Sequence, residues 1–160
     1  MRNVLLLIVL SFFNHSKAQV FGYGYGHLAY QNLIENGICY IKTGDTFFDS
    51  TMLKVLEDHW TVSEFTFVEQ YKKPTADATA LFLTSKTPTK KYVRDKANQY
   101  ILVLQPSKNY HKDKDVPMEQ TLGYMYYNGF HTMATADEHW RFNRYIIHCL
   151  NEGLKMIQEN

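Results

Sequence analysis

The sequence predicts a single α/β domain preceded by a cleaved signal peptide. Three observations indicate this: an apolar N-terminal leader, two continuous apolar runs typical of central β-strands, and a long amphipathic segment at the C-terminus typical of a helix. We expect a mixed sheet of about five strands covered by two main helices, with an ordered core over residues 27–158.

Residues 1–18 have the three parts of a secretory signal peptide. Arg2 provides the positive charge, residues 4–13 are apolar apart from one serine, and the small side chains of Ser16 and Ala18 occupy the positions that signal peptidase reads. The apolar core is too short to span a bilayer as a mature helix. The pattern therefore predicts export.

We expect the mature chain to begin at Gln19, with residues 19–160 forming one secreted or periplasmic domain. Loss of Arg2 and Lys17 from the 17 basic residues leaves 15 against 16 acidic residues, a net charge of −1. Nucleic-acid-binding domains usually carry a strongly basic face, and no further apolar run has the length of a membrane span. We expect neither a nucleic-acid partner nor a transmembrane anchor after cleavage.

The first half of the mature chain predicts a helix, a strand, a helix and a strand. These elements are expected over residues 27–35, 38–42, 49–60 and 64–69. Gly37 is placed to end the first helix, and Asp49 or Ser50 to cap the second. The strand–helix–strand order favours a parallel pair with a right-handed crossover.

The second half contains the two apolar runs, residues 78–83 and 100–104. Strands of this kind are usually covered on both faces and central in the sheet. Residues 121–127 are a plausible last strand, in which Gly123 indicates a bulge or a sheet edge.

The C-terminal helix is predicted to begin with a capping box, in which Thr135 caps the helix and Glu138 reaches back. Its buried face is expected to include apolar residues at helical spacing: Phe142, Tyr145, Ile146, Cys149, Gly153, Met156 and Ile157. Four more apolar residues broaden this face: Trp140, Ile147, Leu150 and Leu154.

Four aromatic residues form a candidate ligand surface for sugar or peptide: Tyr124, Tyr126, Tyr127 and Phe130. In a strand, Tyr124 and Tyr126 point to one face and Tyr127 to the other, so one side of the group faces the core. The alternative interpretation is that the many tyrosines simply fit a half-buried sheet.

The two cysteines, Cys39 and Cys149, are candidates for one disulfide, since an exported protein meets an oxidising compartment. The alternative is two buried thiols that pack as small apolar groups.

His131, Glu138 and His139 lie near the start of the last helix and form a candidate metal site. Acidic residues are common at helix starts for dipole and capping reasons alone, and the sequence lacks both H-E-x-x-H and C-x-x-C. Nucleophile motifs such as G-x-S-x-G are also absent. We therefore assign no catalytic, cofactor-binding or metal-binding residue, and expect no cofactor.

The stretch GICYIKTGDTFFDSTMLKVLEDHWTVSEFTFVE, followed by ATALFL, resembles small uncharacterised envelope proteins of Bacteroidota. These often have a leader ending in Ala-Gln, as at Ala18-Gln19, and a helix ending in Trp before a strand, as at Trp60. The arrangement over residues 37–104 is also similar to the N-terminal α/β domain of periplasmic TolB-like proteins. The resemblance implies an accessory or protein-binding module and carries over no functional residue.

The leading hypothesis is an exported, non-enzymatic module that acts through protein–protein contacts in the cell envelope. It predicts an exposed sheet edge or apolar patch. The alternatives are a carbohydrate- or small-ligand-binding domain that uses the tyrosines, and a metal-dependent hydrolase built around His131, Glu138 and His139.

Overall fold

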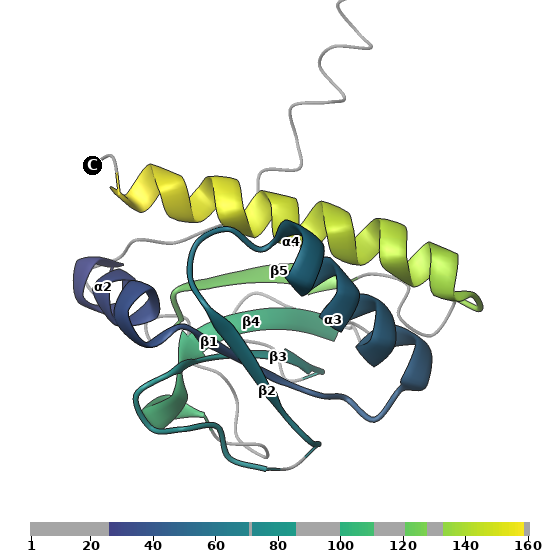
Figure 1. Cartoon of the computed structure of the whole chain (residues 1–160), viewed down its shortest axis with the longest axis horizontal. Coiled ribbons are helices and arrows are strands. Elements are labelled where there is room, and N and C mark those ends of the chain that lie inside the picture. The colour runs from purple at the N-terminus through teal and green to yellow at the C-terminus, as the bar shows by residue number, and fades with distance from the viewer. Residues whose placement is uncertain (1–25, 71, 86–99, 111–120, 128–132, 159–160) are drawn as a thin grey trace, which may run out of the picture.

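The computed structural model describes residues 26–70, 72–85, 100–110, 121–127 and 133–158, and it is a single α/β domain with a five-stranded mixed sheet (Figure 1). The predicted fold class is therefore confirmed. The predicted signal peptide, residues 1–18, lies outside the described residues. The elements in chain order are α2 (Gly26–Asn36), β1 (Ile38–Ile41), α3 (Thr46–His59), β2 (Phe65–Val68), β3 (Thr79–Thr84), β4 (Tyr100–Pro106), the 3-10 turn η1 (Ser107–Asn109), β5 (Gly123–Tyr127) and α4 (Ala136–Gln158).

The strand order in the sheet is β2-β1-β3-β4-β5. β1 runs parallel to both β2 and β3, whereas β4 is antiparallel to β3 and to β5. The predicted parallel pair is β1–β2. The two apolar runs form β3 and β4, which have neighbours on both sides, and Gly123 begins the edge strand β5.

Both faces of the sheet are buried, and the three described helices all pack against the same face. Alternate strand residues, such as Tyr40, Leu81 and Leu102, pack in one core with side chains of α2, α3 and α4. The opposite set forms a second core that contains Ile41, Phe82 and Val103 and no residue of these helices. On this face, Tyr110 follows η1 and packs edge-on against Phe82, with ring centroids 4.9 Å apart.

Gly37 connects α2 to β1, as predicted. Its φ is 72°, a left-handed conformation that ends helices and that side chains with a Cβ rarely adopt. A Cβ at this position would lie 2.6 Å from the carbonyl oxygen of Glu64, next to β2. Glycine is therefore required both for the turn and for close backbone packing.

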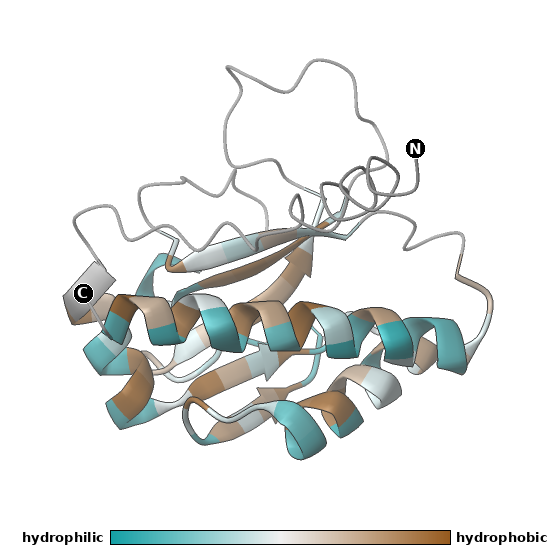
Figure 2. Ribbon diagram, turned by 90° about the horizontal axis from the view of Figure 1, so that it is seen from above, coloured by the Kyte–Doolittle hydropathy of each residue, from teal (hydrophilic) through white to brown (hydrophobic). Residues whose placement is uncertain are grey.

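The long helix α4 turns most of its predicted apolar face toward the core, but the prediction was wrong at several positions. Figure 2 shows hydrophilic and hydrophobic residues alternating along it. Two residues expected on its buried face are exposed, Tyr145 at 39% and Met156 at 61%. The buried face includes polar side chains that the apolar pattern omitted, and its members are His139, Asn143, Ile146, Ile147, Leu150, Asn151 and Leu154.

The predicted cap of α3 was also wrong. The helix begins one turn earlier than expected, because the side chain of Asp45 accepts a hydrogen bond of 2.9 Å from the amide of Phe48. The predicted capping box of α4 is confirmed: the Glu138 amide donates to Thr135 Oγ1, and the Thr135 amide donates to Glu138 Oε2.

Candidate functional site

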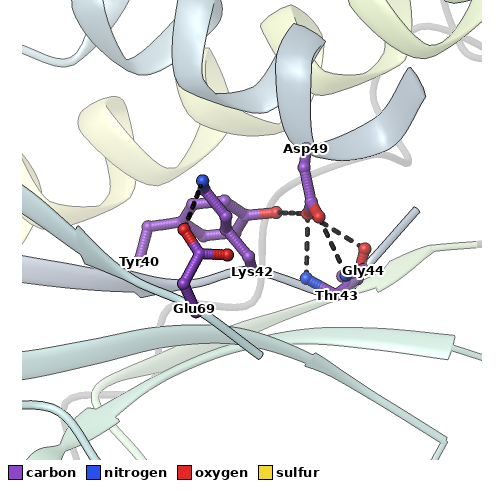
Figure 3. A network of polar contacts seen from close by, with 6 residues as sticks. All are labelled: Tyr40, Lys42, Thr43, Gly44, Asp49 and Glu69. Atoms are coloured by element: carbon purple, nitrogen blue, oxygen red, sulfur yellow. Dashed lines mark hydrogen bonds and ion pairs between the residues drawn. The ribbon is translucent and has the colours of Figure 1, made fainter. Parts of the chain in front are cut away.

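The turn from β1 into α3 is held by the carboxylate of Asp49 (Figure 3). Oδ1 accepts the Tyr40 hydroxyl at 2.5 Å, the Thr43 amide at 2.8 Å and the Thr43 hydroxyl at 2.9 Å. Oδ2 accepts the Gly44 amide at 2.8 Å. Asp49 is therefore not the helix cap that its position in the sequence suggested, but a buried clamp that closes the turn.

This clamp lacks the properties of an acid–base centre. Burial raises the pKa of Tyr40 well above its usual range, and the charge of Asp49 and the hydrogen bond to it raise that pKa further. The Tyr40 hydroxyl therefore remains a protonated donor at physiological pH. Both carboxylate oxygens of Asp49 already have partners, so this arrangement serves the fold.

A second buried network joins β5, α4 and α3. The Tyr127 hydroxyl donates to Asn143 Oδ1 at 2.9 Å and lies 3.3 Å from His139 Nδ1. Asn143 Nδ2 then donates to Thr51 Oγ1 at 3.0 Å. Burial raises the pKa of Tyr127 above its usual range. All four side chains are buried, which makes the network a link between three elements of the core.

The predicted aromatic surface is divided by the sheet. Tyr124 is buried on the face away from the helices, and its ring meets that of Tyr126 edge-on with centroids 5.7 Å apart. Tyr126 is 39% exposed, whereas Tyr127 is fully buried on the helix side. Phe130 lies outside the described residues. The predicted alternation is therefore correct, and the three described tyrosines do not share one exposed surface.

The candidate metal ligands on α4, Glu138 and His139, do not lie together: one is exposed and the other is buried. Glu138 is exposed, and hydrogen bonds from the Ala134 amide, the Thr135 hydroxyl and the Thr135 amide lower its pKa. His139 is 2% exposed and contacts Tyr127 in the core. His131 lies outside the described residues. In the part of the chain that the structure describes, no three His, Cys, Asp or Glu side chains gather as metal ligands.

Both cysteines are free thiols in the structure. Cys39 is buried in β1, and its side chain has the same direction as that of Ile41, away from the helices. Burial raises its pKa, and the hydrogen bond with Thr66 lowers it by less. Cys149 lies half-buried on α4, on the helix side of the sheet. This arrangement corresponds to the alternative of two unpaired thiols.

The outer edge of β2 carries backbone groups that do not pair with β1. Ile38 donates to the carbonyl of Glu64, and Lys42 donates to that of Val68. In a parallel ladder, alternate residues point toward the neighbour, so the N–H and C=O groups of Phe65 and Phe67 point away from β1. Among the described residues, no backbone bond to these outward groups is found.

The side chains around this edge present an apolar ring with an ion pair beside it. Phe67 is 50% exposed, and Lys42 Nζ lies 4.6 Å from the centre of its ring. The same ammonium pairs with Glu69 Oε1 at 2.8 Å, as Figure 3 shows. The β2 edge, defined here as Phe65–Val68 with Lys42 and Glu69, thus combines open backbone groups with an exposed aromatic ring.

Two grooves of about 490 Å³ each lie beside α4 and share Thr61 and Lys155. The α2 groove is lined by Tyr30, Gln31, Ile34, Glu35, Thr61, Val62, Lys155 and Gln158. The α3 groove is lined by His59, Thr61, Arg141, Arg144, Tyr145, His148, Asn151, Glu152 and Lys155. Neither groove was predicted from the sequence, because the lining residues come from separate elements.

No protein family, curated protein or solved structure was found to match this chain. The resemblance to Bacteroidota envelope proteins and TolB-like domains therefore stays a prediction. Within the described ranges, no helix has both the length and the apolar character needed to span a bilayer.

Proposed function

We propose that this protein is an exported, non-enzymatic module that binds an extended segment of a partner protein by strand addition at the β2 edge. The observation that supports the proposal is the outward direction of the Phe65 and Phe67 backbone groups at an open edge of the sheet. An unpaired edge is a template for another strand, in which main-chain hydrogen bonds provide affinity.

The side chains of the β2 edge favour a segment with an apolar residue. Phe67 offers an exposed ring, and burying apolar surface contributes about 25 cal/mol per Å². Lys42 and Glu69 lie beside the ring with one charge of each sign. A charged residue of the bound segment, next to its apolar residue, could therefore form an ion pair with one of them.

A partner protein is a better occupant than a second copy of the chain. β2 has four residues, and only Phe65 and Phe67 direct their backbone groups outward. Pairing two such edges would bury far less than the roughly 800 Å² per partner typical of stable interfaces. A longer extended segment from another protein can also contact the surface around the edge.

The proposal can be tested with a phage-displayed library of nine-residue peptides and two variants of one residue. In Phe67→Pro, the missing N–H is the outward one, so the ladder to β1 is retained while the bond to an added strand is lost. In Phe67→Val, a smaller aliphatic side chain replaces the aromatic ring, but the outward N–H remains. We expect selected peptides to bind Phe67→Val with moderately reduced affinity and Phe67→Pro at least about tenfold more weakly.

Circular dichroism and urea unfolding will establish that both variants fold. As a second readout, a photo-crosslinking benzoylphenylalanine at position 67 should label the peptide, whereas the same group at Phe47, exposed on the first turn of α3, should not. Equal binding to the proline variant, or labelling from position 47 alone, would refute strand addition at β2. Self-association that Phe67→Pro abolishes would instead identify a second copy as the occupant.

Export is tested independently by N-terminal sequencing of protein recovered from the producing cells. We expect the chain to begin at Gln19 in the periplasmic or extracellular fraction. Recovery of intact Met1 in the cytosol would contradict the exported part of the proposal.

A further inference from the structure

We infer that the α2 groove binds an apolar side chain of the same partner segment that pairs with the β2 edge. The inference rests on the proposed function and deepens it, because it gives the bound segment a second apolar anchor at a set distance from the first. The groove lies between α2, the connection from α3 to β2 and the end of α4.

The groove lies next to the start of β2. A Cβ at Gly37, just after α2, would lie 2.6 Å from the carbonyl oxygen of Glu64, and Ile38 donates to the same oxygen at 3.0 Å. The groove is lined by Ile34, three residues before Gly37, and by Val62, two residues before Glu64. In Figure 1, the connection from α3 into β2 passes beside α2. The groove is therefore continuous with the N-terminal end of the β2 edge.

An extended segment paired with β2 is long enough to reach the groove. Val62 precedes Phe65 by three positions, and an extended chain spans at most about 3.3–3.6 Å per residue, so the two lie within about 11 Å. A segment of nine residues is about 30 Å long, and pairing with Phe65 and Phe67 uses about three or four of them. Residues beyond Phe65 therefore remain to enter the groove.

The lining of the groove suits an apolar side chain. Ile34 is 44% exposed although it is a large aliphatic residue, and Val62 is half-buried. The Tyr30 hydroxyl donates to Gln158 Oε1 at 3.2 Å, so the polar tip of this ring already has a partner. The volume of the groove, about 490 Å³, lies within the range of roughly 300–1,000 Å³ found for ligand sites. An apolar side chain that covers Ile34 and Val62 removes their surface from water, which favours binding.

The charged residues of the lining do not select a charged ligand. Glu35 and Lys155 have opposite signs, Glu35 is exposed, and Lys155 pairs with Glu152 at 2.8 Å. The α3 groove differs, because two arginines and two histidines line it together with the same lysine. The α2 groove is therefore the one of the two that suits an apolar residue.

The test uses the nine-residue peptides selected from the phage-displayed library. Photo-crosslinking from benzoylphenylalanine at position 67, followed by mass spectrometry, identifies the peptide residue opposite Phe67. The same group at position 34 should label the peptide about five residues away, since Val62 precedes Phe67 by five positions. At position 28 it should not label the peptide, because Leu28 is 76% exposed on α2 but outside the lining.

Ile34→Gln and Leu28→Gln are matched variants, because each replaces an exposed aliphatic side chain of α2 by the same helix-compatible polar one. By isothermal titration calorimetry, we expect Ile34→Gln to weaken peptide binding by about fivefold or more and Leu28→Gln to leave it unchanged. Alanine at the peptide residue labelled from position 34 should weaken binding to the unmodified protein by a similar factor. It should have little further effect on Ile34→Gln, because the two changes remove the same contact.

The outcomes separate this inference from the proposed function. Peptides that lose affinity for Phe67→Pro, yet bind Ile34→Gln as tightly as the unmodified protein, would overturn the role of the groove and leave strand addition at β2 in place. Full affinity of a peptide shortened to the residues that pair with β2 would do the same without any change to the protein. Peptides that depend on Ile34 but not on the N–H of Phe67 would overturn both, as would a library from which no peptide is selected.

Discussion

The two ends of α3 use buried polar side chains in opposite ways. At its N-terminal end, Asp49 has hydrogen-bond partners at both oxygens, and Asp45 caps the helix. At its C-terminal end, Asn151 donates to His59 but leaves Oδ1 without a donor, beside a groove lined by basic residues. The N-terminal end is therefore fully paired, whereas the C-terminal end contains a buried oxygen without a donor.

This difference separates buried polar groups that stabilise the fold from one that also carries a cost. Buried polar atoms in folded proteins are nearly always paired, so a fully paired group such as Asp49 needs no function beyond the fold. An unpaired buried atom instead costs about 1–3 kcal/mol, so Asn151 stabilises the fold by less than its bond to the His59 carbonyl alone would. The comparison therefore predicts that changes at the two ends differ in kind.

The largest effect is expected for Asp49→Ala. The substitution leaves the buried Tyr40 hydroxyl and the part-buried amides of Thr43 and Gly44 without their acceptor. Hydrogen bonds to a charged group contribute about 1.5–3 kcal/mol each, so we expect a loss of about 3 kcal/mol or more in the free energy of unfolding. Urea denaturation measures this loss.

Asp45→Asn is the matched control for that experiment, because asparagine caps helices as well as aspartate does. We expect its stability to stay within about 0.5 kcal/mol of the unmodified protein. A loss below about 1 kcal/mol for Asp49→Ala would remove the distinction between the two ends of α3.

The next effect appears at alkaline pH. Because the pKa values of Tyr40 and Tyr127 are raised in the folded state, both stay protonated there after the unfolded chain has begun to lose these protons near pH 10. Their contribution to stability is complete below about pH 10 and decreases above it, by about 1.4 kcal/mol per pH unit for each residue. Tyr40→Phe should therefore remove the contribution of one tyrosine, about 1.4 kcal/mol per pH unit, from that slope.

Urea titrations between pH 8 and pH 11.5, roughly spanning the ordinary tyrosine pKa, measure the slope. The matched comparison is Tyr127→Phe, which removes the other of these two phenols with a raised pKa and should reduce the slope by a similar amount. A slope unchanged by Tyr40→Phe would mean that the Asp49 clamp does not hold the phenol in its protonated form.

Much of the fold was predictable because it depends on local patterns. Continuous apolar runs placed β3 and β4, the strand–helix–strand order gave the parallel pair, and Thr135 with Glu138 gave the start of α4. In each case, the residues that decide the structure are close together in the sequence, so periodicity and capping rules apply directly.

The errors arose where a polar side chain has a distant partner. The predicted buried face of α4 omitted His139 and Asn143, because both are polar yet buried. Their partners, Tyr127 and Thr51, come from other elements. The α3 groove was missed for the same reason. Its lining joins the end of α3 to α4 across about 90 residues of sequence, and Asn151 near the chain end bonds to His59. Composition and spacing contain no information on such convergence.

The smallest stability effect is expected for Asn151→Ala at the C-terminal end of α3. The change removes the hydrogen bond to the His59 carbonyl, but it also removes an oxygen that is buried without a donor, so the two contributions partly cancel. We expect a loss of about 1 kcal/mol or less in urea unfolding. A loss as large as that of Asp49→Ala would contradict the comparison, because it would mean that Asn151 stabilises the fold as strongly as the fully paired carboxylate of Asp49. Urea denaturation of the two alanine variants side by side therefore tests whether the two ends of α3 differ, since only the Asp49 carboxylate has partners at both of its oxygens.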